Sequence, residues 1–112
     1  MTQASASTME TLHHVGISVA DRDAALAFWE RFLEKPPRWK TVLDRPYLGR
    51  ITGYPNVAIK AAFVDLPGGV VVELLDYQVE GRTPNTEVTA NPGNVHLCLK
   101  VEDAAKAWKH AV

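Results

Sequence analysis

Three side chains that can bind a metal ion stand within otherwise apolar, strand-like stretches of this sequence: His14, Glu73 and His96. Glu73 interrupts the apolar run from Val70 to Leu75, and burying a carboxylate without a partner costs several kcal/mol. A cation or hydrogen-bond donors must therefore contact the Glu73 carboxylate. Two imidazoles and one carboxylate suit Fe(II), Mn(II), Ni(II), Co(II) or Zn(II), and this donor set does not decide among them.

The elements that carry these side chains follow from the hydrophobic periodicity. Apolar and polar residues alternate over residues 12–19, which predicts a half-buried strand with His14 on the face opposite the apolar one. Asp21 then offers an N-cap for an amphipathic helix that must end before Pro36. Turn formers and β-prone runs predict three further strands, at residues 39–43, 58–65 and 70–77.

The opening pattern returns near the end of the sequence. His96 lies 82 positions after His14, and the same offset aligns three more identical residues: Val19 with Val101, Asp21 with Asp103, and Ala25 with Ala107. A strand over residues 94–101 and a helix capped by Asp103 are therefore expected. If the repeat brings the two first strands together about a pseudo-twofold axis, His14 and His96 are placed symmetrically, and Glu73 can complete the set.

The composition divides the chain into four parts. Residues 1–10 are expected to form a flexible tail, residues 11–78 a βαβββ module, residues 79–93 a linker, and residues 94–112 the start of a second, truncated module. The predicted fold class is α+β, with paired βαβββ modules of which the second is only partly present.

Three segments resemble a known family, the vicinal oxygen chelate superfamily of glyoxalases, bleomycin-resistance proteins and extradiol dioxygenases. LHHVGISVAD (12–21) resembles the first strand and helix cap of such a module, LPGGVVVEL (66–74) its last hairpin, and VHLCLKVED (95–103) the opening of a second module. The resemblance implies a cupped sheet around one divalent metal (Zn, Ni, Fe, Mn or Co), with ligands at His14, Glu73 and His96.

The resemblance also implies a fourth ligand in the second module. By the same offset, this counterpart of Glu73 falls near position 155, beyond Val112. We therefore expect the functional unit to contain more polypeptide, either as a C-terminal stretch or as a partner chain, and a homodimer is the expected assembly.

The resemblance implies several activities on small molecules. The leading hypothesis is a lyase, isomerase or epimerase that acts through a metal-stabilised enolate, with Glu73 as a ligand that can also serve as base. A ring-cleaving Fe(II) dioxygenase is the alternative enzyme, and a non-catalytic drug-binding protein is the alternative class. The presence of all three side chains favours an enzyme, because a simple binder has no reason to bury a carboxylate between two imidazoles.

Other polar residues are weaker candidates. Arg45, Tyr47 and Arg50 lie in the loop before the third strand and are candidate substrate contacts, although an ordinary solvated loop is the favoured interpretation. Strand alternation assigns His13 to the face opposite His14. Cys98 shares the His96 face and receives no catalytic role.

The overall composition excludes several classes of protein. Lys and Arg number 12 against 13 Asp and Glu, with no basic stripe, which argues against nucleic acid as a partner. No apolar run approaches the roughly 20 residues that span a bilayer. The single cysteine, Cys98, excludes an intrachain disulfide and suits a reducing compartment, so the cytoplasm is the expected location.

Overall fold

The computed structural model describes residues 8–112, so most of the tail expected at residues 1–10 lies outside the described residues. Along the chain the elements are β1 (Val15–Ser18), α1 (Arg22–Leu33), β2 (Trp39–Leu43), α2 (Leu48–Thr52), β3 (Ile59–Asp65), β4 (Val71–Tyr77) and α3 (Ala104–Ala111). The first module thus has the predicted order of strand, helix and three strands, and the α+β class is confirmed.

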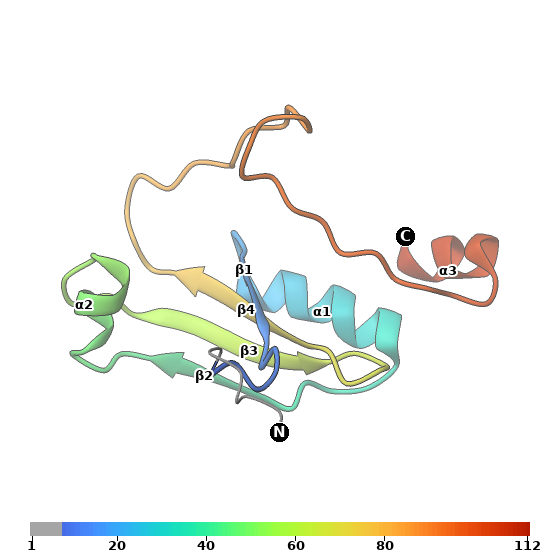
Figure 1. Ribbon diagram of the computed structural model, residues 1–112, viewed down its shortest axis with the longest axis horizontal. Coiled ribbons are helices and arrows are strands. Elements are labelled where there is room, and N and C mark those ends of the chain that lie inside the picture. The colour runs from blue at the N-terminus through green and yellow to red at the C-terminus, as the bar shows by residue number, and fades with distance from the viewer. Residues whose placement is uncertain (1–7) are drawn as a thin grey trace, which may run out of the picture.

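The four strands form one mixed sheet in the order β1-β4-β3-β2 (Figure 1). β1 runs parallel to β4, whereas β3 is antiparallel to both β4 and β2. The β3–β4 hairpin closes where Leu66 N–H donates to the Val70 carbonyl at 2.8 Å. Gly68 and Gly69 make this tight turn possible, because both adopt positive φ angles, of 88° and 85°. The topology leaves β1 at one edge of the sheet.

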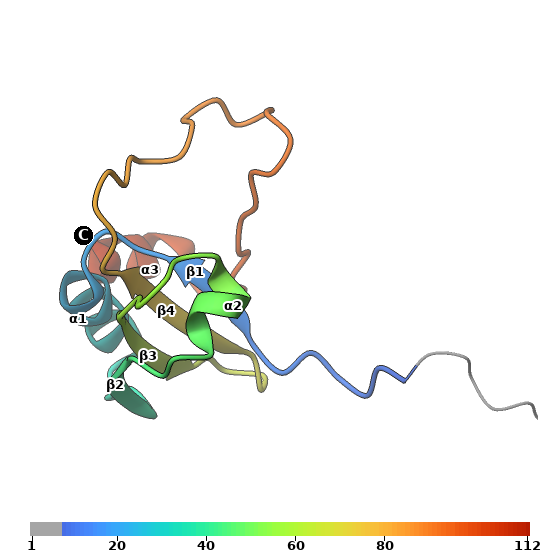
Figure 2. The same cartoon turned by 90° about the vertical axis from the view of Figure 1, so that its left-hand side faces the viewer.

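Helix α1 covers one face of the sheet (Figure 2). It begins where the Asp21 side chain accepts a hydrogen bond from Ala24 N–H, and it ends at Glu34, which has a left-handed φ of 57°. Its apolar side packs on alternate residues of the strands. The buried members of this core are Leu26, Ala62, Val64, Leu66, Val72 and Leu74.

The other face of the sheet is covered only in part. Leu48 of α2 packs at one end of this face on a second core cluster that includes Val57, Ile59 and Ala61. The sequence predicted a loop here, because a helix as short as Leu48–Thr52 presents too few turns for a periodic pattern. Further along the same face lie Phe63 and Glu73, which the β3–β4 register places opposite each other.

A buried carboxylate ties the end of β4 to the start of α1. Asp76, which is 5% exposed, accepts hydrogen bonds from Arg22 N–H at 3.0 Å, from Gln78 Nε2 at 2.9 Å and from Arg82 Nη1 at 3.0 Å. Arg82 also donates to the carbonyls of Val19 and Ala20, in the turn between β1 and α1. The linker after β4 is therefore anchored at its first turn.

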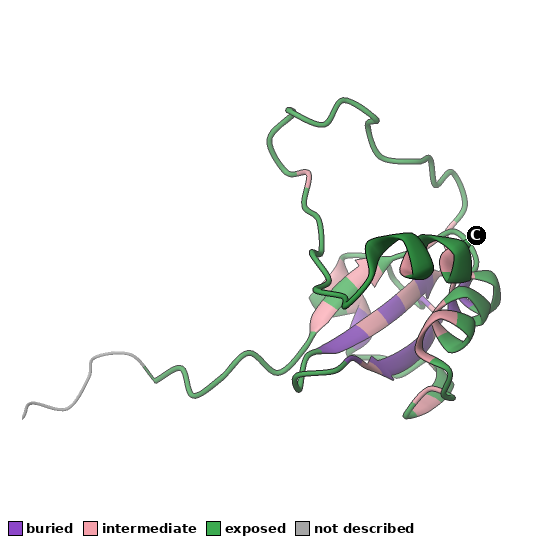
Figure 3. Ribbon diagram, turned by 90° about the vertical axis from the view of Figure 1, so that its right-hand side faces the viewer, coloured by how far each residue is buried: buried purple, intermediate pink, exposed green. Residues whose placement is uncertain are grey.

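The strand expected over residues 94–101 is wrong for this structure. These residues are extended, but none of the described strand ladders includes them, and residues 79–103 form a long exposed connection (Figure 3). The apolar alternation is present, with Val95, Leu97 and Leu99 all exposed. Alternation predicts a strand only where a neighbouring strand offers hydrogen bonds, and no described segment lies in register beside this one.

The helix predicted after Asp103 is confirmed as α3, with the Asp103 side chain accepting from Lys106 N–H. It packs on the outer side of α1, where Arg31 Nη2 donates to the Ala111 carbonyl at 3.0 Å. The boundaries proposed for the linker and second module stay predictions. Among the described residues, no helix is long and apolar enough to cross a membrane.

Candidate metal centre

His14 and Glu73 meet on the face of the sheet opposite α1. The β3–β4 register pairs Phe63 with Glu73, and the His14 ring lies 5.1 Å from the Phe63 ring, so all three side chains share this face. His14 Nε2 is 3.4 Å from Glu73 Oε1, and the two side chains are 36% and 14% exposed. Two of the three predicted ligands are therefore neighbours, and both can be reached from solvent.

The spacing of this pair fits a shared cation. Zinc and similar ions bind imidazole nitrogen and carboxylate oxygen at about 2.0–2.2 Å, so two ligands at neighbouring tetrahedral corners lie about 3.4 Å apart. The observed 3.4 Å agrees with that value and exceeds the roughly 2.7–3.2 Å of an ordinary N–H···O hydrogen bond.

Aromatic rings border the pair. The His14 ring lies 5.1 Å from the Phe63 ring, and Phe63 stacks on Trp39 of β2 at 4.3 Å. The Arg38 guanidinium lies 5.9 Å from the Phe63 ring centroid and pairs with Asp65, whose pKa it holds below its usual value by hydrogen bonding and charge. The polar pair thus stands beside an apolar aromatic surface, an arrangement common in small-molecule sites.

His13 also lies at this site, so its expected place on the opposite face is wrong. Its Nδ1 is 2.8 Å from His14 Nδ1, and its ring is 6.2 Å from that of Phe63. β1 begins only at Val15, so the two-residue alternation of a strand does not govern residue 13. The sequence did hold one signal for this contact. His13 and His14 are adjacent and precede the strand, so both side chains can turn to the same side.

His96 is exposed in the extended connection and does not join the pair. Within residues 8–112, no group of three or more His, Cys, Asp or Glu side chains is close enough to hold a metal ion. The structure therefore brings together His14 and Glu73, and the inclusion of His96 stays a prediction.

The candidate substrate residues lie in α2 and in the turn that precedes it. Arg45, Tyr47 and Arg50 are all exposed, and α2 covers the other end of the sheet face that carries Glu73. Their assignment to substrate binding stays a prediction.

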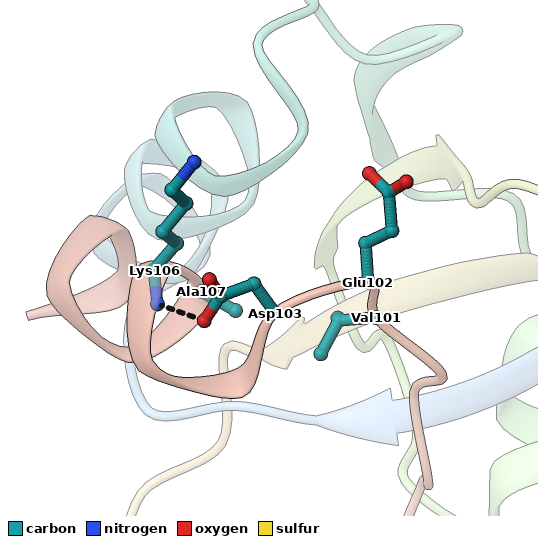
Figure 4. A pocket seen from close by; sticks show the side chains of 5 residues that line it. All are labelled: Val101, Glu102, Asp103, Lys106 and Ala107. Atoms are coloured by element: carbon teal, nitrogen blue, oxygen red, sulfur yellow. Dashed lines mark hydrogen bonds between the residues drawn. The ribbon is translucent and has the colours of Figure 1, made fainter.

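Two surface hollows lie away from the pair. One is formed by the residues that open α3, where the Asp103 carboxylate is occupied by its bond to Lys106 N–H (Figure 4). The other, an apolar groove of about 350 Å³, runs between residues 97–101, the end of α1 and the β3–β4 turn. Neither hollow is lined by His14 or Glu73.

The described residues contain one βαβββ module, with His14 just before its first strand and Glu73 on its last. The model of the Glyoxalase/Bleomycin resistance protein/Dioxygenase superfamily matches residues 13–112, nearly all of the chain. The chain belongs to this superfamily, and the resemblance noted in its motifs is confirmed.

A solved structure supports the fold. A glyoxalase family protein from Bacillus cereus matches with a TM-score of 0.73 at 20% sequence identity, over 96% of this chain and 73% of that one. At this identity the match establishes the shared fold alone. No curated protein sequence matches the chain.

Proposed function

We propose that this protein is a metal-dependent enzyme that isomerises, epimerises or cleaves a small carbonyl compound by removing a proton next to the carbonyl. The observation that carries the proposal is the pairing of His14 Nε2 with Glu73 Oε1 at 3.4 Å on an open sheet face, in a chain of this superfamily. One divalent ion (Zn, Ni, Fe, Mn or Co) is the proposed cofactor.

The residues of the first module have distinct roles in this proposal. His14 and Glu73 hold the cation, which when bound supplies a Lewis acid that offsets negative charge developing on a substrate oxygen. Glu73 has a second carboxylate oxygen, which can accept the proton from the neighbouring carbon. Half-buried Trp39, which stacks on Phe63, offers an apolar surface for the rest of the substrate. Arg45, Tyr47 and Arg50 are proposed to contact its polar end from α2 and the turn before it.

We further propose that a second copy of this chain completes the centre. β1 is an edge strand, and the segment that repeats its sequence, residues 94–101, has no strand partner among the described residues. Val95 is 90% exposed and Trp108 is 69% exposed, which is unusual for large apolar side chains. Pairing of that segment with β1 of the other copy brings His96 toward His14 and Glu73.

A test of this assembly is sedimentation equilibrium of the chain with and without a charge on the pairing segment. We expect a dimer, and we expect Leu97→Lys to give a monomer because a buried lysine would lack a partner. Val88→Lys, at an apolar residue that is 57% exposed and outside the pairing segment, is the matched control and should leave the dimer intact. A monomeric parent chain would contradict the proposed assembly.

The function is tested by metal content and by two reaction assays. We expect about one divalent ion per site by elemental analysis of the purified protein. In deuterated water, the hydrogen next to the carbonyl of α-hydroxy or α-dicarbonyl compounds should exchange in a metal-dependent manner. Oxygen uptake with catechols would instead show the dioxygenase alternative, and tight drug binding without metal would show the binder.

Because the single cysteine suits a reducing compartment, we place this activity in the cytoplasm.

A further inference from the structure

The two ring nitrogens of His14 have different neighbours. Nε2 lies 3.4 Å from Glu73 Oε1, whereas Nδ1 lies 2.8 Å from Nδ1 of His13. The second distance is within hydrogen-bond range, and one of the two Nδ1 atoms must carry the proton for the bond to form. His14 therefore stands between a carboxylate and a second imidazole.

Metal binding decides the direction of that hydrogen bond. An imidazole that binds a cation through Nε2 uses the Nε2 lone pair, so in the neutral ring the proton resides on Nδ1. That N–H normally donates to an acceptor, which fixes the orientation of the ring and raises the basicity of the ligand. The acceptor placed to receive it is the unprotonated Nδ1 of His13.

We propose that His13 is a positioning residue for the metal centre, accepting the Nδ1–H of His14 and holding its Nε2 toward Glu73. This inference rests on the proposed function, because it assumes that His14 binds a cation. His13 faces the Nδ1 edge of the His14 ring, whereas Glu73 faces the Nε2 edge, where a shared cation would bind, so His13 acts through His14. The His14 side chain is 36% exposed, and Phe63 contacts its ring from one side. A hydrogen bond from His13 therefore restricts the rotation of a ring that packing alone does not fix.

The first test is zinc affinity, measured by competition with a chromophoric chelator on the full 112-residue chain. We expect His13→Ala to weaken zinc binding by about 10- to 100-fold, the usual effect of losing a partner of a ligating histidine. His13→Gln retains a carbonyl acceptor and should recover most of that loss. His110→Ala removes an imidazole from α3 and should bind zinc as the parent does.

The second test reads the proton directly. In the zinc-loaded chain, nitrogen-15 NMR of the histidine rings should show His14 protonated at Nδ1 and His13 with an unprotonated Nδ1. Parent-like affinity in His13→Ala would overturn the inference while leaving the metal proposal standing. A zinc-shifted Nδ1 signal from His13, with no recovery in His13→Gln, would also overturn it by making His13 a ligand. A parent chain that binds no zinc would overturn both proposals.

Discussion

Replacing His14 by alanine is expected to lower metal affinity by more than about 100-fold, because it removes a ligand rather than a partner of a ligand. Glu73→Gln should also weaken binding strongly, since an amide keeps the shape of the side chain but brings no charge. His96→Ala should do the same if His96 completes the centre in the assembled protein. Elemental analysis after dialysis measures all three.

His96→Ala should leave the metal-free protein nearly as stable as the parent, because His96 is exposed and surface substitutions usually alter the free energy of unfolding by about 0.5 kcal/mol or less. His14→Ala should cost more, because it leaves the Glu73 carboxylate, which is only 14% exposed, without its imidazole partner. His110→Ala is the matched control and should keep its metal. Parental metal content in His14→Ala and Glu73→Gln would remove the chelation hypothesis and leave a polar cluster held by hydrogen bonds.

The largest effect on stability is expected at Asp76. Asp76→Ala should lower the free energy of unfolding by roughly 3 kcal/mol, because it deprives Arg22 N–H, Gln78 and Arg82 of a shared buried acceptor. Urea denaturation of the chain, followed by circular dichroism, measures the loss.

Arg82→Ala is the comparison for this variant. The Arg82 side chain is 39% exposed, and its removal leaves Asp76 with two donors, so the loss should be clearly smaller. Equal losses for the two variants would mean that the ion pair, and not the buried carboxylate, carries the effect.

The first module could be predicted from sequence because its signals are local. Two-residue alternation before Asp21, the cap at Asp21 and the stop before Pro36 are enough to place β1 and α1. The pairing of His14 with Glu73 could be anticipated as well, since a carboxylate in an apolar strand requires a partner. The observed strand ends differ from the expected ones by up to three residues, and β1 is the shortest strand.

The remaining features depend on how the folded chain is arranged around each residue, and not on the local pattern alone. The extended state of residues 94–101 depends on whether a neighbouring strand is present, which alternation does not reveal. The contact of His13 with His14 depends on the residue at which β1 begins. The role of Asp76 depends on the β1–α1 turn and the linker, which both contact the end of β4. Its partners Arg22 and Arg82 are 54 and 6 positions away from Asp76 in the sequence.

The central claim is that His14 and Glu73 bind one divalent cation together. Crystals grown with zinc and measured on both sides of the zinc absorption edge test it directly, because the anomalous difference map locates the ion. We expect a single strong peak within about 2.0–2.3 Å of both His14 Nε2 and Glu73 Oε1. A peak elsewhere, or no peak while the two side chains keep their 3.4 Å contact, would contradict it.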